Sequence, residues 1–145
     1  MRQKTGKFFE VVVAYEKATE DGLVKKVKET VVVEADSCGE AETRSLEEIA
    51  SYCAGDMECV KIALASYKEV LFADEGDVFY KVKVNLITID EVSAKEKKTA
   101  IFYLTSASSI DGARRNIVSS YEGSVMDYDI CLLQETKITE VYEKQ

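Results

Sequence analysis

Residues that commonly carry out catalysis are scarce or poorly spaced in this sequence. It contains no histidine, which removes the usual general base near neutral pH and every Ser-His or Cys-His nucleophile pair. The cysteines form no C-x-x-C pair, so a zinc site is disfavoured and we expect four reduced, mostly buried thiols. We therefore predict a protein that is not an enzyme and uses no cofactor. The cysteines are Cys38, Cys53, Cys59 and Cys131.

Two clusters of lysine are the clearest candidates for a binding site, because each accompanies a predicted hairpin turn. Lysines on a hairpin could follow a phosphate backbone, and the nearby rings of Tyr15, Phe102 and Tyr103 could stack on bases. The alternative is that the lysines keep exposed strand ends soluble and block edge-to-edge pairing, since Glu29 and Glu96 dilute both clusters. The first cluster is Lys25, Lys26 and Lys28, and the second is Lys95, Lys97 and Lys98.

A second cationic feature is the pair Arg114 and Arg115, near the start of a predicted helix. The pair could hold an anion or simply form a solvated helix face.

The hydrophobic pattern predicts the same four elements twice, in the order strand, strand, helix, strand. In the first half we expect strands at 8–16 and 24–35 around an Asp-Gly turn, a helix capped by Ser37, and a strand at 57–72. In the second half we expect strands at 79–86 and 99–104 and a helix capped by Ser109 or Ser108. A strand at 126–133 follows, and a short tail occupies 141–145.

The two halves match at individual positions, which predicts a tandem duplication. Val11 corresponds to Val82, and the capping residue Ser37 corresponds to Ser109. We therefore predict an α+β protein built from two β-β-α-β repeats, residues 1–74 and 75–145, that together form one compact domain. Because neither repeat could bury both its helix and its sheet alone, we expect two helices packed on one side of a mostly antiparallel sheet.

Composition and charge bear on the cellular location of the protein and on the partners it can bind. A helix that spans a membrane needs roughly 20 consecutive apolar residues, and the apolar runs are much shorter. No signal-peptide pattern follows the N-terminus, so we expect a cytoplasmic protein that does not contact membranes. The net charge of −8 works against general binding to nucleic acid, but it permits a local basic face.

Several segments resemble a family known as domain of unknown function 4494. In the second half these are Lys95–Ala100, Met126–Ile130 and Glu135–Tyr142. In the first half they are Phe8-Phe9-Glu10 and the turn at Asp21-Gly22. Family members often carry Trp near the start of each repeat, where this chain has Phe8 and Phe79. The resemblance implies a Bacteroidetes cell, phage or mobile element as the source, and it implies no known activity.

Two functions are consistent with these features. The first hypothesis is a binding or accessory protein in nucleic-acid metabolism, with a single strand as the partner and Lys25, Lys26, Lys28, Lys95, Lys97, Lys98, Tyr15 and Tyr103 as the contact residues. The alternative is an interaction or assembly protein that binds a second copy of itself or a host protein.

Overall fold

The computed structural model describes residues 1–144, and these residues form an α+β fold, as predicted. No helix in this part of the chain has both the length and the apolar character needed to cross a bilayer. The elements are β1 (Arg2–Lys4), β2 (Phe8–Ala18), β3 (Val24–Glu34), α1 (Cys38–Ala50), β4 (Met57–Ala65), β5 (Tyr67–Phe72), β6 (Val78–Ile89), β7 (Glu96–Ala107), α2 (Ile110–Ser120), β8 (Asp127–Glu135) and β9 (Ile138–Tyr142).

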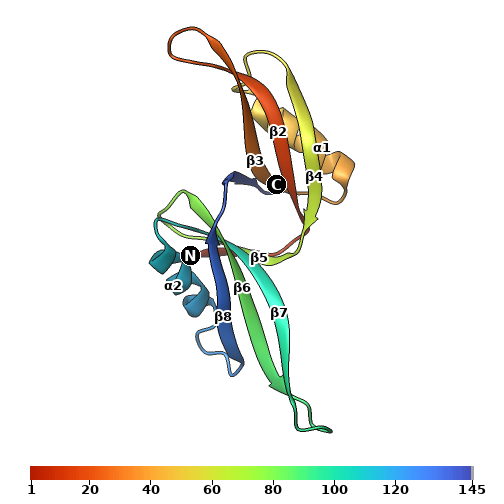
Figure 1. The fold of residues 1–145 in the computed structure, drawn as a ribbon, viewed down its shortest axis with the longest axis vertical. Coiled ribbons are helices and arrows are strands. Elements are labelled where there is room, and N and C mark those ends of the chain that lie inside the picture. Colours follow the sequence, from red (N-terminus) through yellow and green to blue (C-terminus); the bar gives the residue numbers. More distant parts are fainter. Residues whose placement is uncertain (145) are drawn as a thin grey trace. The chain divides into compact units, whose positions relative to one another are not determined.

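The strands form two sheets, and each sheet carries one helix (Figure 1). The α1 unit contains residues 7–66 and the segment that begins at Lys137, and its sheet has the order β4-β2-β3-β9. The α2 unit contains residues 1–6 and 67–136, and its sheet has the order β1-β5-β7-β6-β8. The prediction of both helices on one shared sheet was therefore wrong, although most strand pairs are antiparallel as expected.

The two halves of the chain exchange strands. β5 directly follows β4 in sequence, yet it pairs in parallel with β7 of the α2 unit. β9 follows β8, yet it pairs in parallel with β3 of the α1 unit. Each helix-bearing unit is therefore completed by a strand that the other half of the chain supplies.

The exchanged strands occupy equivalent places in the two sheets. β9 places Val141 opposite Val32, and β5 places Val70 opposite Leu104. Both parallel pairs contain a register shift, and the pairs β2–β4 and β6–β8 each contain another. These irregularities are shared features of the two units, and the tandem duplication stays a prediction.

Matched polar contacts hold the end of each exchanged strand. Just after β9, the backbone N–H of Lys144 donates to the carboxylate of Glu34 at 2.8 Å. Just after β5, the backbone N–H of Ala73 donates to the hydroxyl of Ser106 at 2.9 Å. Glu34 and Ser106 are buried, so both acceptors satisfy a backbone group where an unmade bond would be costly.

Both helices begin at the predicted capping residues. The hydroxyl of Ser37 accepts the N–H of Glu40 at 3.2 Å, and the hydroxyl of Ser109 accepts the N–H of Gly112 at 3.1 Å. The carboxylate of Glu40 also reaches back to the start of the helix, where it accepts the N–H of Asp36, the residue before the cap, at 2.9 Å. These contacts confirm Ser109, rather than Ser108, as the second cap.

Two boundaries differ from the prediction. The segment 57–72 is not one strand, because the chain leaves the α1 unit at Ser66 and enters the α2 unit at Tyr67. Alternation of side chains continues on both sides of this break, so a local pattern does not reveal it. The predicted tail begins within strand β9, and Gln145 lies outside the described residues.

Candidate functional site

Both long hairpins continue beyond the strands that flank them. β4 pairs with β2 only as far as Tyr15, and β9 pairs with β3 only from Thr30 onward. β2 and β3 nevertheless stay paired out to Ala18 and Val24. β6 and β7 also stay paired past the ends of β8 and β5. The outer part of each hairpin is therefore a two-stranded segment, which we call the β2–β3 ribbon and the β6–β7 ribbon.

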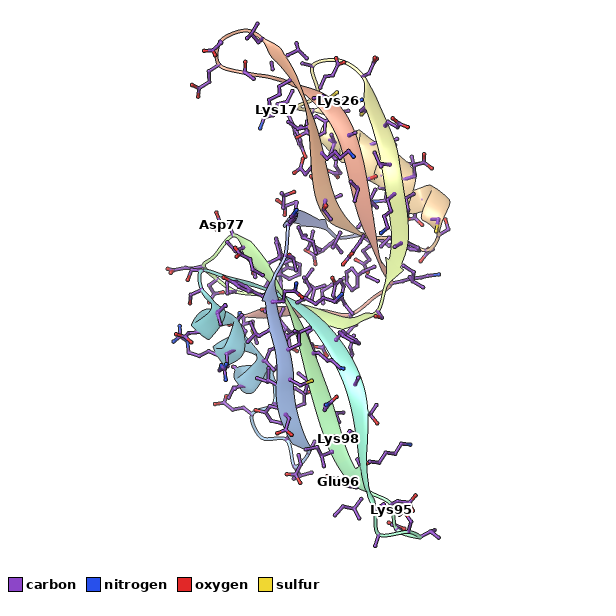
Figure 2. All side chains as sticks on the ribbon, in the orientation of Figure 1. Lys17, Lys26, Asp77, Lys95, Glu96 and Lys98 are labelled. Carbon is purple, nitrogen blue, oxygen red and sulfur yellow. The ribbon has the colours of Figure 1, made fainter. Side chains whose placement is uncertain are left out.

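All six lysines of the predicted site are exposed and belong to these two hairpins. Within residues 1–144, none of their ammonium groups takes part in an ion pair. Their charge is thus available to an outside anion. Figure 2 shows Lys17 and Lys26 along the first hairpin, and Lys95, Glu96 and Lys98 toward the tip of the second.

The lysines do not all point to the same side of their ribbon. Lys26 and Lys28 project from the face away from α1, because alternate positions such as Val27 pack toward the α1 core. Lys25 projects to the α1 side, directly opposite Lys17 of β2. A single bound strand would therefore contact a subset of each cluster.

The two predicted tyrosines are buried. Tyr15 is 4% exposed and Tyr103 is 3% exposed, so neither ring offers a face on which a base could stack in this conformation. The hydroxyl of Tyr15 donates to Glu29 at 2.9 Å, and the hydroxyls of Tyr103 and Tyr121 lie 2.6 Å apart. Their role in the structure is to link strands and helix ends through hydrogen bonds.

A groove of about 300 Å³ lies at the base of the β2–β3 ribbon. Tyr15 contributes to it together with Lys28, so two of the predicted residues meet here. Tyr52 is the more accessible ring, with 38% of its surface exposed. We call this site the ribbon groove, and its lining residues are Tyr15, Lys17, Val27, Lys28, Glu29, Tyr52 and Thr139.

Glu29 organises the inner wall of the ribbon groove. Its carboxylate accepts hydrogen bonds from the hydroxyls of Tyr15, Tyr52 and Thr139. Tyr52 also lies 3.2 Å from the hydroxyl of Tyr142, which belongs to the exchanged strand β9. Sequence patterns do not indicate this cluster, because its members come from β2, β3, β9 and the turn after α1.

The ionisation of Tyr15 makes stability depend on alkaline pH. Burial, followed by the hydrogen bond to Glu29, raises the pKa of Tyr15 from 10.0 to about 12. The folded protein therefore holds this proton more tightly than the unfolded chain does. We predict that the free energy of unfolding falls as the pH rises from about 10 to about 12. The variant Tyr15→Phe should lose less stability over that range, as measured by urea unfolding at several pH values. An equal loss in both proteins would contradict this assignment.

A second depression, of about 490 Å³, lies beside the end of β9. Its two cations already have partners. Arg44 donates to the carbonyl oxygens of Glu34 and Glu143, and Lys144 forms ion pairs with Asp36 at 2.6 Å and Glu40 at 3.6 Å. The contact with Lys144 lowers the pKa of the Asp36 carboxyl group. We therefore interpret this depression as an anchor for β9.

The cysteines are less buried than predicted. All four are free thiols, but Cys38 and Cys131 are exposed and Cys53 and Cys59 are only half-buried. Burial, with the charge of Glu42, raises the pKa of the Cys59 thiol, which disfavours the reactive thiolate near neutral pH.

Comparison with known proteins supports one family assignment. The sequence profile of a domain of unknown function, DUF4494, matches residues 7–144. No curated protein and no solved structure matches the chain. The match covers both helices and every strand except β1, including both exchanged strands. The chain therefore belongs to the DUF4494 family.

Proposed function

We propose that this chain is a non-enzymatic nucleic-acid-binding accessory protein in the cytoplasm of a Bacteroidetes cell or of a cell infected by its phage. In this proposal the two lysine-bearing ribbons contact the phosphates of a single strand. The observation that carries it is the exposure of six lysines on or next to the hairpin segments that extend past their sheets. Within residues 1–144, none of the six takes part in an ion pair.

The β2–β3 ribbon is the stronger of the two candidate contact surfaces. Lys17 adds a fourth lysine to Lys25, Lys26 and Lys28. The acidic residues of the same segment are Glu16, which lies opposite Lys26, and Glu20, Asp21 and Glu29. Electrostatic interactions between exposed charges fade over roughly 8–10 Å in physiological salt. The exposed lysines of the ribbon therefore act on a nearby phosphate more strongly than the distant acidic groups that contribute to the net charge.

The β6–β7 ribbon carries fewer lysines. Its three lysines are accompanied by Asp90, Glu91 and Glu96. We therefore assign it a supporting contribution and expect most of the binding free energy to come from the β2–β3 ribbon.

The ribbon groove supplies an aromatic ring on which a base of a single strand could stack. Lys17 projects to the same side of the ribbon as Tyr15, and Tyr52 presents an accessible ring in the same groove. A base stacked on an aromatic ring contributes about 1–3 kcal/mol. We therefore assign the stacking role to Tyr52 in place of the buried Tyr15 and Tyr103.

Binding should depend on salt and on the first lysine cluster. We predict that the protein binds a fluorescent single-stranded oligonucleotide of about 20 nucleotides at low salt, as measured by fluorescence anisotropy. Changing the first cluster to glutamine should weaken binding and reduce the slope of log K against log salt by about 0.7–1.4. Each phosphate contact contributes about 0.7, and one strand reaches only the lysines on one face, either Lys25 or the pair Lys26 and Lys28. The same changes in the second cluster should have a smaller effect. The first variant carries Lys25→Gln, Lys26→Gln and Lys28→Gln.

The matched control removes three exposed positive charges elsewhere. It carries Lys68→Gln, Arg114→Gln and Arg115→Gln, so its net charge equals that of the first variant. We expect it to bind almost as well as the natural chain. The proposal is rejected if the natural chain shows no binding at about 10 µM in low salt, or if the control loses as much affinity as the ribbon variant. In the second case the charge effect would be general, or Arg114 and Arg115 would hold the anion.

The alternative is a protein that acts by protein–protein interaction. It is favoured by a separate feature, the uncovered outer edge of β4, which is apolar and carries few charges. Such an edge can accept a strand from another chain through main-chain hydrogen bonds.

A further inference from the structure

The outer edge of β4 differs from the other sheet edges. β4 is an end strand of nine residues, and no strand pairs with its outer side within residues 1–144. The end strands β1 and β9 have only three and five residues. β8 is as long as β4, but it contains Asp127, Asp129 and Glu135 and no lysine or arginine. Like charges would therefore oppose the pairing of β8 with a second β8.

β4 lacks most of the features that protect an edge strand from pairing. Met57, Val60 and Leu64 are 39%, 47% and 61% exposed. Its charged residues are one acid, Glu58, and one base, Lys61. A β-bulge at Val60 is the other feature that distinguishes this edge from a regular strand.

The two charged residues lie on one face of the sheet. Glu58 pairs with Ala14 and Lys61 pairs with Val12, and residues that face each other across a strand pair project to the same side. Met57 and Ile62 pair with Tyr15 and Val11, which belong to the α1 core, so they project to the opposite side.

We propose that the β4 edge binds the β4 edge of a second copy of this chain, in antiparallel orientation. The twofold axis passes between Cys59 and Val60. Glu58 of each copy then lies opposite Lys61 of the other, which forms two cross-strand ion pairs on one face. On the other face, Met57 of each copy lies opposite Ile62 of the other. The result is one continuous sheet across two copies.

Charge and side-chain direction select this register. If the axis passed through Val60, Glu58 would lie opposite Ile62, and the two residues would project to opposite faces. If the axis passed between Val60 and Lys61, Glu58 would lie opposite Ala63 and both ion pairs would be lost. Only the register centred between Cys59 and Val60 places the opposite charges together and pairs Met57 with Ile62 on the other face. It does not depend on nucleic-acid binding.

Charge reversal in the full chain tests both the dimer and its register. The natural chain should sediment as a dimer at about 100 µM in analytical ultracentrifugation. Glu58→Lys places two lysines opposite each other at both sites, and Lys61→Glu does the same with two glutamates. Each should raise the dimer dissociation constant at least about tenfold. The double variant, with both changes, re-forms the opposite-charge pairs and should restore the dimer.

The matched control is Asp129→Lys, which makes the same type of change in β8. It should leave the dimer intact. Circular dichroism checks that each variant folds, which we expect because Glu58 and Lys61 are exposed. A natural chain that stays monomeric at about 100 µM overturns the proposal. The proposal is also overturned if both single reversals leave the dimer dissociation constant unchanged, or if the double variant does not restore the dimer.

Discussion

Residues 1–74 and residues 75–145, produced separately, should each fail to form a stable monomer, and mixing them should restore the fold. The reason is the exchange of strands. The first half lacks β9, which pairs with β3, and the second half lacks β5, which pairs with β7. Leu71 of β5 is fully buried within the core of the α2 unit, so its loss would leave a cavity in addition to an open strand edge.

Circular dichroism and size-exclusion chromatography would measure this effect. Each half alone should show little native signal, and an equimolar mixture should give a 1:1 complex with the spectrum of the full chain. As a control, the full chain can be folded first and then cut at an engineered protease site in the linker 74–77. The two pieces should then stay together.

The decisive outcome is a folded monomer. If either half unfolds cooperatively as a monomer, the exchanged strand is dispensable and the prediction is wrong. A half that folds only as a homodimer would agree with the exchange, because β5 and β9 pair in matching registers and one could replace the other.

Gly76→Ala should be strongly destabilising. Gly76 has a φ of +111°, a backbone conformation that residues other than glycine rarely adopt. An added Cβ would also lie 2.3 Å from the carbonyl carbon of Ala107 and 2.5 Å from the nitrogen of Ser108. Both contacts are to backbone, which cannot move aside as a flexible side chain would. We expect a loss of about 3 kcal/mol or more in the free energy of unfolding, measured with urea.

Gly123→Ala is the matched control for Gly76→Ala. Gly123 also has positive φ, at +78°, but nothing lies within 4 Å of an added Cβ. It should therefore lose only about 1 kcal/mol, the cost of the backbone conformation alone. Equal losses in the two variants would show that the clash of the added Cβ with Ala107 does not lower the free energy of unfolding.

Much of the fold could be predicted locally. The β-branched and aromatic residues of β2, β3, β6 and β7 indicate strands, and the structure has strands there. Ser37 and Ser109 cap the two helices through hydrogen bonds that involve neighbouring residues only. Such contacts depend on short-range sequence, which is why they could be predicted without knowledge of the tertiary structure.

The candidate site was predictable only in part. The exposure of the six lysines follows from their place beside a turn, and turns lie at the surface. The burial of Tyr15 and Tyr103 does not follow from sequence, because a tyrosine in a strand faces either the core or solvent, and the helix that covers it is distant in sequence. The ribbon groove was missed because Thr139 and Glu29 meet only through the pairing of β9 with β3.

The exposed lysines on two ribbons were thus determined by the sequence itself, through the hairpin turns and the charged residues beside them. Which strands complete each sheet was decided only by the tertiary structure. Neither Ser66 nor Lys137 carries a pattern that marks a crossing between units, since alternation specifies that a segment is a strand and not which strand it pairs with. Strand partners are determined by how much apolar surface the whole sheet buries. That burial depends on segments far apart in sequence, so local sequence does not specify it.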